Sequence, residues 1–164
     1  MSEIPTPEDI ASWQRRLASQ ANNRAWTLAE MLHRSPEEDE DMLQAAHAAI
    51  YFWKIVGTPS NQAHAALLLA HVYALLKFPE PAAQYLSKAL PHLMQHDRAP
   101  WEQAFAHAVA ANVAAAEGDA AAQVKHYSEA KVAAAHITDP ETREMFAATL
   151  RVVSRPNLAR SAPT

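Results

Sequence analysis

Cysteine is absent from this sequence of 164 residues, and glycine is nearly absent, with Gly57 and Gly118 the only two. The first absence excludes a disulfide framework, a thiolate nucleophile and a zinc site with cysteine ligands. Alanine, by contrast, occurs 37 times. Because alanine is the best helix former and glycine is among the worst, the composition predicts an all-α chain with no competing strands.

Basic stripes and long apolar runs are missing as well. The formal net charge is −4, which argues against a nucleic-acid partner, since such partners require a basic surface. No stretch approaches about 18 uninterrupted apolar residues. The first residues contain no basic region followed by an apolar one. We therefore expect a cytoplasmic protein with no membrane partner.

Motifs that carry catalysis are not found either. The sequence has no glycine-rich phosphate loop, no G-x-S-x-G elbow and no H-E-x-x-H pair. No catalytic residue, metal or cofactor is predicted, and a non-enzymatic function is favoured. The longest charge run, from Glu37 to Asp41, is acidic and opens a predicted helix. There it meets the positive end of the helix dipole, so we interpret it as structural.

Prolines mark where helices start. "TPED" at 6–9, "SPEE" at 35–38, "TPSN" at 58–61 and "DPET" at 139–142 each place an oxygen-bearing cap before a proline. With weaker signals at 78–81 and 99–102, the pattern predicts seven helices. Pro91 is expected to kink or end the fourth, because proline lacks an N–H. The predicted helices are 7–33, 36–56, 59–77, 80–96, 100–117, 119–137 and 140–153, in one domain spanning 1–154 with a flexible tail at 155–164.

The chain contains an internal repeat. Residues 65–89 align with residues 106–130 without a gap, at an offset of 41 residues. The short connections between the predicted helices require antiparallel hairpins. The small and large residues of each copy follow the signature spacing of the tetratricopeptide repeat, which the chain therefore resembles. These residues are Leu69, Ala70, Tyr73, Ala82, Leu86 and Ala89 in the first copy, and Ala110, Ala111, Gly118, Tyr127 and Ala130 in the second.

A second resemblance covers residues 22–137. The segments "AAHAAIYFW", "VGTPSNQA", "AHVYALL", "PEPAAQYLSKA" and "AFAHAVAANVAAAEGD" are similar to those of small bacterial helical proteins of the tetratricopeptide-repeat-like kind, a group without a known activity. This resemblance implies an α-solenoid of antiparallel helix pairs. Solenoids of this kind bind partners on the concave face lined by the first helix of each pair.

The repeat register predicts which residues line that groove. His64, Leu67, His71 and Leu75 project from one inner helix, and Phe105 and Asn112 occupy equivalent positions on the next. An apolar floor with a few imidazole and amide groups suits a peptide or a modest apolar ligand. A phosphate is disfavoured, because the row has no lysine or arginine. The leading hypothesis is a non-enzymatic interaction protein that binds a protein or peptide partner.

Two alternatives remain open. His47, His64 and His71 could form a metal or acid/base site, although no Asp or Glu occupies a matching position to orient a ring. His92 and His96 have the spacing of a two-histidine metal site, near a helix end. A homodimer could instead fill the groove with its own partner. The four tryptophans suggest a ligand cage. Aromatic residues at helical spacing more often pack in the core, which is the other interpretation. The tryptophans are Trp13, Trp26, Trp53 and Trp101.

Overall fold

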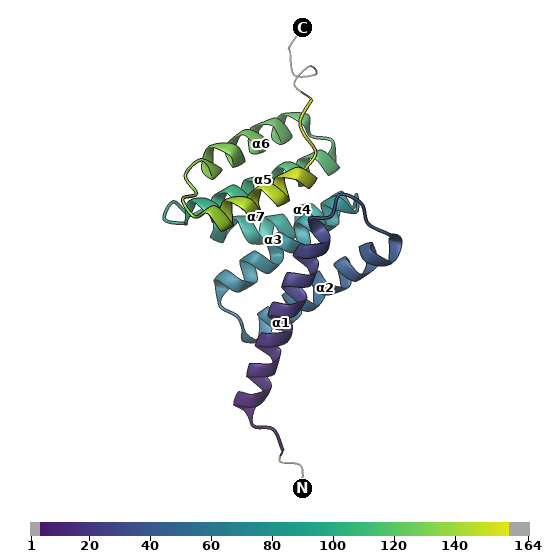
Figure 1. Cartoon of the computed structure of the whole chain (residues 1–164), viewed down its shortest axis with the longest axis vertical. Coiled ribbons are helices and arrows are strands. Elements are labelled where there is room, and N and C mark those ends of the chain that lie inside the picture. The colour runs from purple at the N-terminus through teal and green to yellow at the C-terminus, as the bar shows by residue number, and fades with distance from the viewer. Residues whose placement is uncertain (1–3, 158–164) are drawn as a thin grey trace.

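The computed structural model describes residues 4–157, which form seven α-helices and no strand (Figure 1). The all-α class and the helix count are as predicted. The predicted tail begins at 155, and its residues from 158 onward lie outside the described part. The helices are α1 (Pro7–Ala29), α2 (Pro36–Val56), α3 (Pro59–Leu75), α4 (Pro79–Leu93), α5 (Pro100–Glu117), α6 (Ala120–Ala134) and α7 (Pro140–Val152).

Local capping explains why the helix starts agree with the sequence. Thr6, Ser35 and Thr58 each accept a hydrogen bond from the backbone N–H three residues later, and that residue's side chain accepts from the cap in return. The helix ends agree less well: α1, α4 and α6 each stop several residues before the predicted boundary. Pro91 lies inside α4, which ends two residues later at Leu93.

The helices pack in consecutive pairs, α1 with α2, α3 with α4 and α5 with α6, while α7 lies against α5. Helix α3 also contacts α1 and α5, so α3 and α5 are the most buried helices. Alanine lines the contacts between helices, and Ala89 and Ala130, equivalent by the 41-residue offset, are both fully buried. None of the described helices has the length and hydropathy needed to cross a bilayer.

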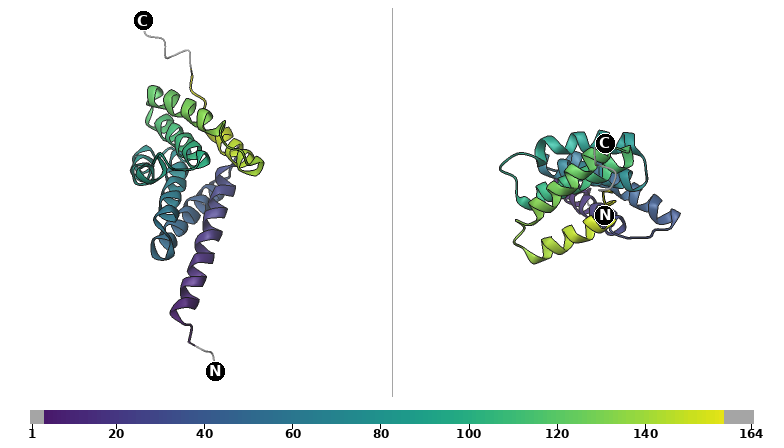
Figure 2. Two further views of the ribbon diagram at one scale, coloured as in Figure 1. Left: turned by 90° about the vertical axis from the view of Figure 1, so that its left-hand side faces the viewer. Right: turned by 90° about the horizontal axis from the view of Figure 1, so that it is seen from above.

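Helix α1 departs from the packing of the other six. Its buried residues, Ala18, Ala25, Leu28 and Ala29, all belong to the second part of the helix. The first part extends past the rest of the described chain toward the N-terminus (Figures 1 and 2). The C-terminal end of α1 therefore packs against the central helices, and its N-terminal end does not.

Candidate functional site

Three of the six predicted groove residues line one cavity. His64 and Leu67 from α3 and Phe105 from α5 border a cavity of about 580 Å³, which we call the aromatic pocket. The remaining walls come from α1, α2 and α7, from the first turn of α3 and from the start of α5. These further lining residues are Asn22, Asn23, Trp26, Thr27, Glu30, Trp53, Asn61, Trp101, Thr142 and Met145.

Phe105 is at the centre of the aromatic side chains of this pocket. Its ring meets Trp26 edge-on at a centroid distance of 6.0 Å and Trp101 edge-on at 6.3 Å. On its other side, Phe105 contacts Phe146 of α7 at 5.5 Å. Such edge-to-face contacts restrain each ring beyond simple burial. The pocket wall is thus a connected aromatic cluster built from α1, α5 and α7.

His64 lies at the edge of the aromatic pocket, stacked on Trp101 at 5.4 Å with an angle of 14° between the ring planes. Its Nε2 is 3.2 Å from Oε1 of Glu102, although the alignment falls short of a hydrogen bond. Burial lowers the pKa of His64, and the negative charge of Glu102 acts in the opposite direction. From the sequence, no carboxylate was expected beside these histidines, and Glu102 corrects that expectation.

Glu102 was missed because it belongs to a different helix pair. Its other oxygen accepts a hydrogen bond of 3.2 Å from the backbone N–H of Ala99, at the start of α5. The packing of α5 beside α3 brings this first turn next to His64. The available signal in the sequence was the proline-marked helix start at 99–102. It predicted the helix, but it did not predict that this helix start would lie next to His64.

His71 and Asn112 correct the predicted groove. Both are buried, with relative exposures of 0% and 1%, and they line neither of the two described cavities. Asn112 Nδ2 lies 3.1 Å from His71 Nδ1, and the Trp26 ring lies 5.7 Å from the His71 ring. Burial, with a smaller effect from the Arg34 charge, lowers the pKa of His71 to about 3. Helix α1 crosses α3 here, so side chains expected in an open groove lie inside the protein.

Leu75 also lies outside the aromatic pocket. It is half-buried and packs against the apolar cluster that joins α1, α2 and α3, which contains Leu28, Met42 and Leu68. The repeat register placed Leu75 on the same face of α3 as His71, and in the structure the two residues do share that face. At Leu75, this face of α3 is covered by the end of α1 and by α2.

The predicted histidine trio does not come together. His47 Nε2 lies 2.7 Å from the Tyr73 hydroxyl and its ring faces Tyr85 of α4, whereas His64 and His71 face α5. Within residues 4–157, no group of three His, Cys, Asp or Glu side chains is placed to hold a metal ion. This corrects the alternative site at His47, His64 and His71, and gives no third ligand to the pair His92 and His96.

Apart from the imidazole of His64, the aromatic pocket has one ionisable side chain. Glu30, at the end of α1, is the one carboxylate among the lining residues, which include no lysine or arginine. Burial raises the pKa of Glu30, and the positive charge of Arg151 opposes this effect. Asparagine side chains at the rim offer both a donor and an acceptor. The pocket can therefore hold an apolar group and hydrogen-bond a polar backbone beside it.

The repeat register anticipated no site residue from α1 or α7, and only Trp26 had been suggested from the sequence, as part of a ligand cage of tryptophans. Trp26, Glu30 and Met145 lie outside the repeat from which the groove was predicted. The unusual number of tryptophans was the available signal, because three of the four line the aromatic pocket. Comparison with protein-family models, with curated proteins and with solved structures gave no match to this chain.

Proposed function

We propose that the protein is a non-enzymatic binding module, whose helix pairs stack in the tetratricopeptide-repeat manner and which takes a segment of a protein partner in the aromatic pocket. The observation that carries the proposal is the combination of Trp26, Trp101 and Phe105 with asparagines at the rim. The proposal keeps the cytoplasmic location and the bacterial relationship expected from the sequence.

A peptide matches both parts of this lining. A peptide group carries one N–H donor and one carbonyl acceptor, and an asparagine amide can pair with both. Asn22 and Asn23 of α1 supply such amides, whereas Asn61 Oδ1 already accepts from Thr58, so Asn61 offers the pocket only its amide N–H groups. An apolar side chain of the partner would rest on Trp26, Trp101 and Phe105. Aromatic residues of this kind dominate binding energy at many protein interfaces.

Glu30 gives the pocket a preference in charge. Its carboxylate is partly buried, and no hydrogen bond or ion pair to it is found among the described contacts, apart from the electrostatic effect of Arg151. A partner with a lysine or arginine next to its apolar anchor would neutralise this charge, and an acidic residue there would be repelled. The expected ligand is therefore an apolar anchor with a basic neighbour.

Selection from a random peptide library tests the function. Wild-type protein should enrich peptides with a large apolar residue and few acidic neighbours. The Trp101→Ala variant should no longer enrich these peptides. Phe78→Ala is the control, because Phe78 is an exposed aromatic residue outside the pocket. Failure to enrich any motif, or a motif retained by Trp101→Ala, would contradict the proposal.

Self-association is a second candidate function, favoured by the exposed part of α1. Ile10, Trp13 and Leu17 are 43%, 53% and 46% exposed, and their spacing places them on one helical face. Acidic residues at 8–9 precede basic residues at 15–16 on the same helix. In an antiparallel pair of α1 helices from two copies, these opposite charges would face each other. We propose a second copy as the partner of this face.

A further inference from the structure

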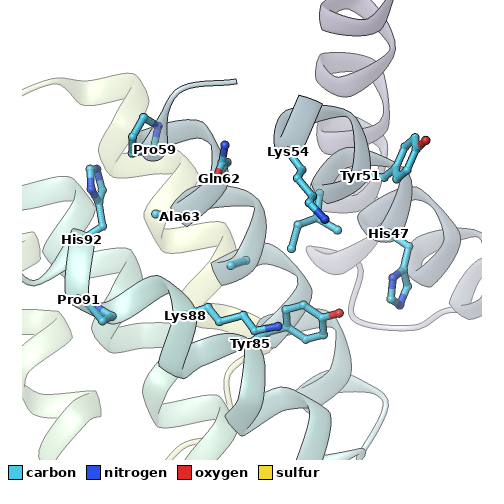
Figure 3. Close-up of a pocket in the computed structure, with 12 residues that line it drawn as sticks. His47, Tyr51, Lys54, Pro59, Gln62, Ala63, Tyr85, Lys88, Pro91 and His92 are labelled. Atoms are coloured by element: carbon cyan, nitrogen blue, oxygen red, sulfur yellow. The ribbon is translucent and has the colours of Figure 1, made fainter. Parts of the chain in front are cut away.

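A second cavity, of about 720 Å³, shares no lining residue with the aromatic pocket. It lies between α2 and α4, with the first turns of α3 between them (Figure 3). We call it the lysine pocket, after Lys54 of α2 and Lys88 of α4. Its volume is within the range of small-molecule sites, roughly 300–1,000 Å³.

The charge of the lysine pocket is opposite to that of the whole chain. Lys54 and Lys88 extend from different walls toward the space between them (Figure 3). No aspartate or glutamate is among the lining residues, although the chain has a net charge of −4. In the described part of the chain, neither lysine forms an ion pair. Two unpaired cations facing one cavity favour an anionic occupant.

The walls between the lysines are apolar and aromatic. Ile50, Ala63 and Ala66 line the cavity together with two prolines. At one end Tyr85 stacks on Tyr73 at 5.9 Å with an angle of 13° between the rings, and Lys88 Nζ lies 4.5 Å from the Tyr85 ring centre. This wall is fixed by the bond of 2.7 Å between His47 and Tyr73. A flat or branched apolar body would fit between such walls.

His92 adds a polar group without a partner. Its Nε2 is buried from solvent and forms no hydrogen bond within the described residues, and the ring borders the same cavity. A nitrogen that is closed to solvent is also closed to a ligand that enters from solvent, so His92 contributes only the side of its ring to the cavity wall. The cavity therefore offers two ammonium groups beside an apolar floor.

We propose that the lysine pocket binds an organic anion, with a carboxylate, sulfonate or phosphate group between Lys54 and Lys88 and an apolar ring or chain against Ile50 and Tyr85. Apolar burial supplies affinity, and the lysines select for negative charge. The site is independent of the peptide-binding function, because it uses different residues on different helix faces.

A pair of fluorescent probes tests this site. 8-Anilinonaphthalene-1-sulfonate is an aromatic anion, and N-phenyl-1-naphthylamine is its neutral counterpart without the sulfonate. The wild-type protein should bind the anion at least about tenfold more tightly than the neutral probe. Lys54→Gln and Lys88→Gln should each weaken the binding of the anion by about tenfold. The affinity for the neutral probe should stay unchanged in both variants. Lys131→Gln, an exposed lysine on α6 outside the pocket, is the matched control.

Location is tested with Trp101→Ala, which removes a wall of the aromatic pocket. The proposal requires that this variant keep tight binding of the sulfonate. It is overturned if the two probes bind equally, if the wild-type protein binds neither, or if Trp101→Ala abolishes anion binding while the lysine variants do not. Circular dichroism melting curves for each variant separate a lost site from a lost fold.

Discussion

Asn112 Nδ2 lies 3.1 Å from His71 Nδ1, and the two residues are 41 positions apart, which is also the period of the internal repeat. Equivalent positions of two repeats thus contact each other on neighbouring helices, α3 and α5. In this arrangement Asn112 Nδ2 donates and His71 Nδ1 accepts, which leaves the ring proton to Nε2, a buried atom without a partner among the described residues. This buried pair links the two helix pairs.

Removing one partner of this pair should be more harmful than removing both. Asn112→Leu leaves a buried His71 nitrogen without its donor, and we expect a loss of about 1–3 kcal/mol in the free energy of unfolding. The double variant His71→Leu with Asn112→Leu should lose less than the sum of the single variants. Guanidinium unfolding at pH 7.5 in a double-mutant cycle measures the difference. Strict additivity would contradict the pairing.

Stability should fall as the solution becomes acidic. The pKa of His71 is lowered to about 3 by burial, so the imidazole stays neutral in the folded protein while the unfolded chain takes up a proton near pH 6.5. The unfolded state therefore binds more protons between pH 6.5 and about 3, and the folded state loses stability across that window. Burial also lowers the pKa values of His47, His64, His107 and His126, which act in the same direction.

Denaturation midpoints at pH 7.5, 5 and 4 measure this dependence. The double variant at His71 and Asn112 should show a flatter profile between pH 5 and 4, where the contribution of His71 persists. Equal midpoints for the wild-type protein at pH 7.5 and 4 would show that His71 is not held neutral by burial.

The effect of Glu102 on His64 is measurable directly. In Glu102→Gln the amide oxygen can still accept from the Ala99 N–H, but the negative charge near His64 is removed. Because that charge favours the protonated ring, the pKa of His64 should fall further. NMR titration of the His64 ring proton detects the shift. Glu117→Gln, at the other end of α5, is the control and should leave His64 unchanged.

Alanine at the helix contacts should not accept a larger side chain. Ala89 and Ala130 are fully buried, so Ala89→Leu or Ala130→Leu should overpack the helix pair and cost about 1–3 kcal/mol. Ala121→Leu is the control, because Ala121 is exposed on α6. Thermal unfolding compares the three variants. If both buried substitutions leave the melting temperature unchanged, the repeat alignment does not describe the packing.

Self-association through α1 should respond to charge. Trp13→Glu should give a monomer in sedimentation equilibrium if the exposed face of α1 pairs two copies. Glu8→Lys and the double variant Arg15→Glu with Arg16→Glu should each weaken the homodimer, and an equal mixture should recover it, because the opposite charges then face each other again. A wild-type protein that sediments as a monomer at high concentration would remove this candidate.

Helix starts could be predicted because each depends on a few neighbouring residues. A cap such as Ser35 and the proline after it specify the start whatever the rest of the chain does. Helix ends lack such signals here, except at the two glycines: Gly57 follows α2, and Gly118, with a φ of 79°, suits the left-handed turn that ends α5. The repeat period correctly placed His71 level with Asn112.

The accessibility of those residues could not be predicted from the repeat. Whether His71 faces solvent or protein depends on the end of α1, where Trp26 covers it. Helix α1 lies outside the repeat, so no internal alignment shows where it packs. For the same reason the repeat predicted three lining residues of the aromatic pocket, His64, Leu67 and Phe105, but not its walls from α1 and α7.

The aromatic pocket takes Trp26 from the first helix and Met145 from the last, which are 119 positions apart in the sequence. Both α1 and α7 must therefore be packed in place before the pocket is complete. A ligand in the pocket would contact both α1 and α7, and would oppose the fraying of either helix. Occupancy would then distinguish a molecule in which α1 and α7 are both packed from one that lacks either helix.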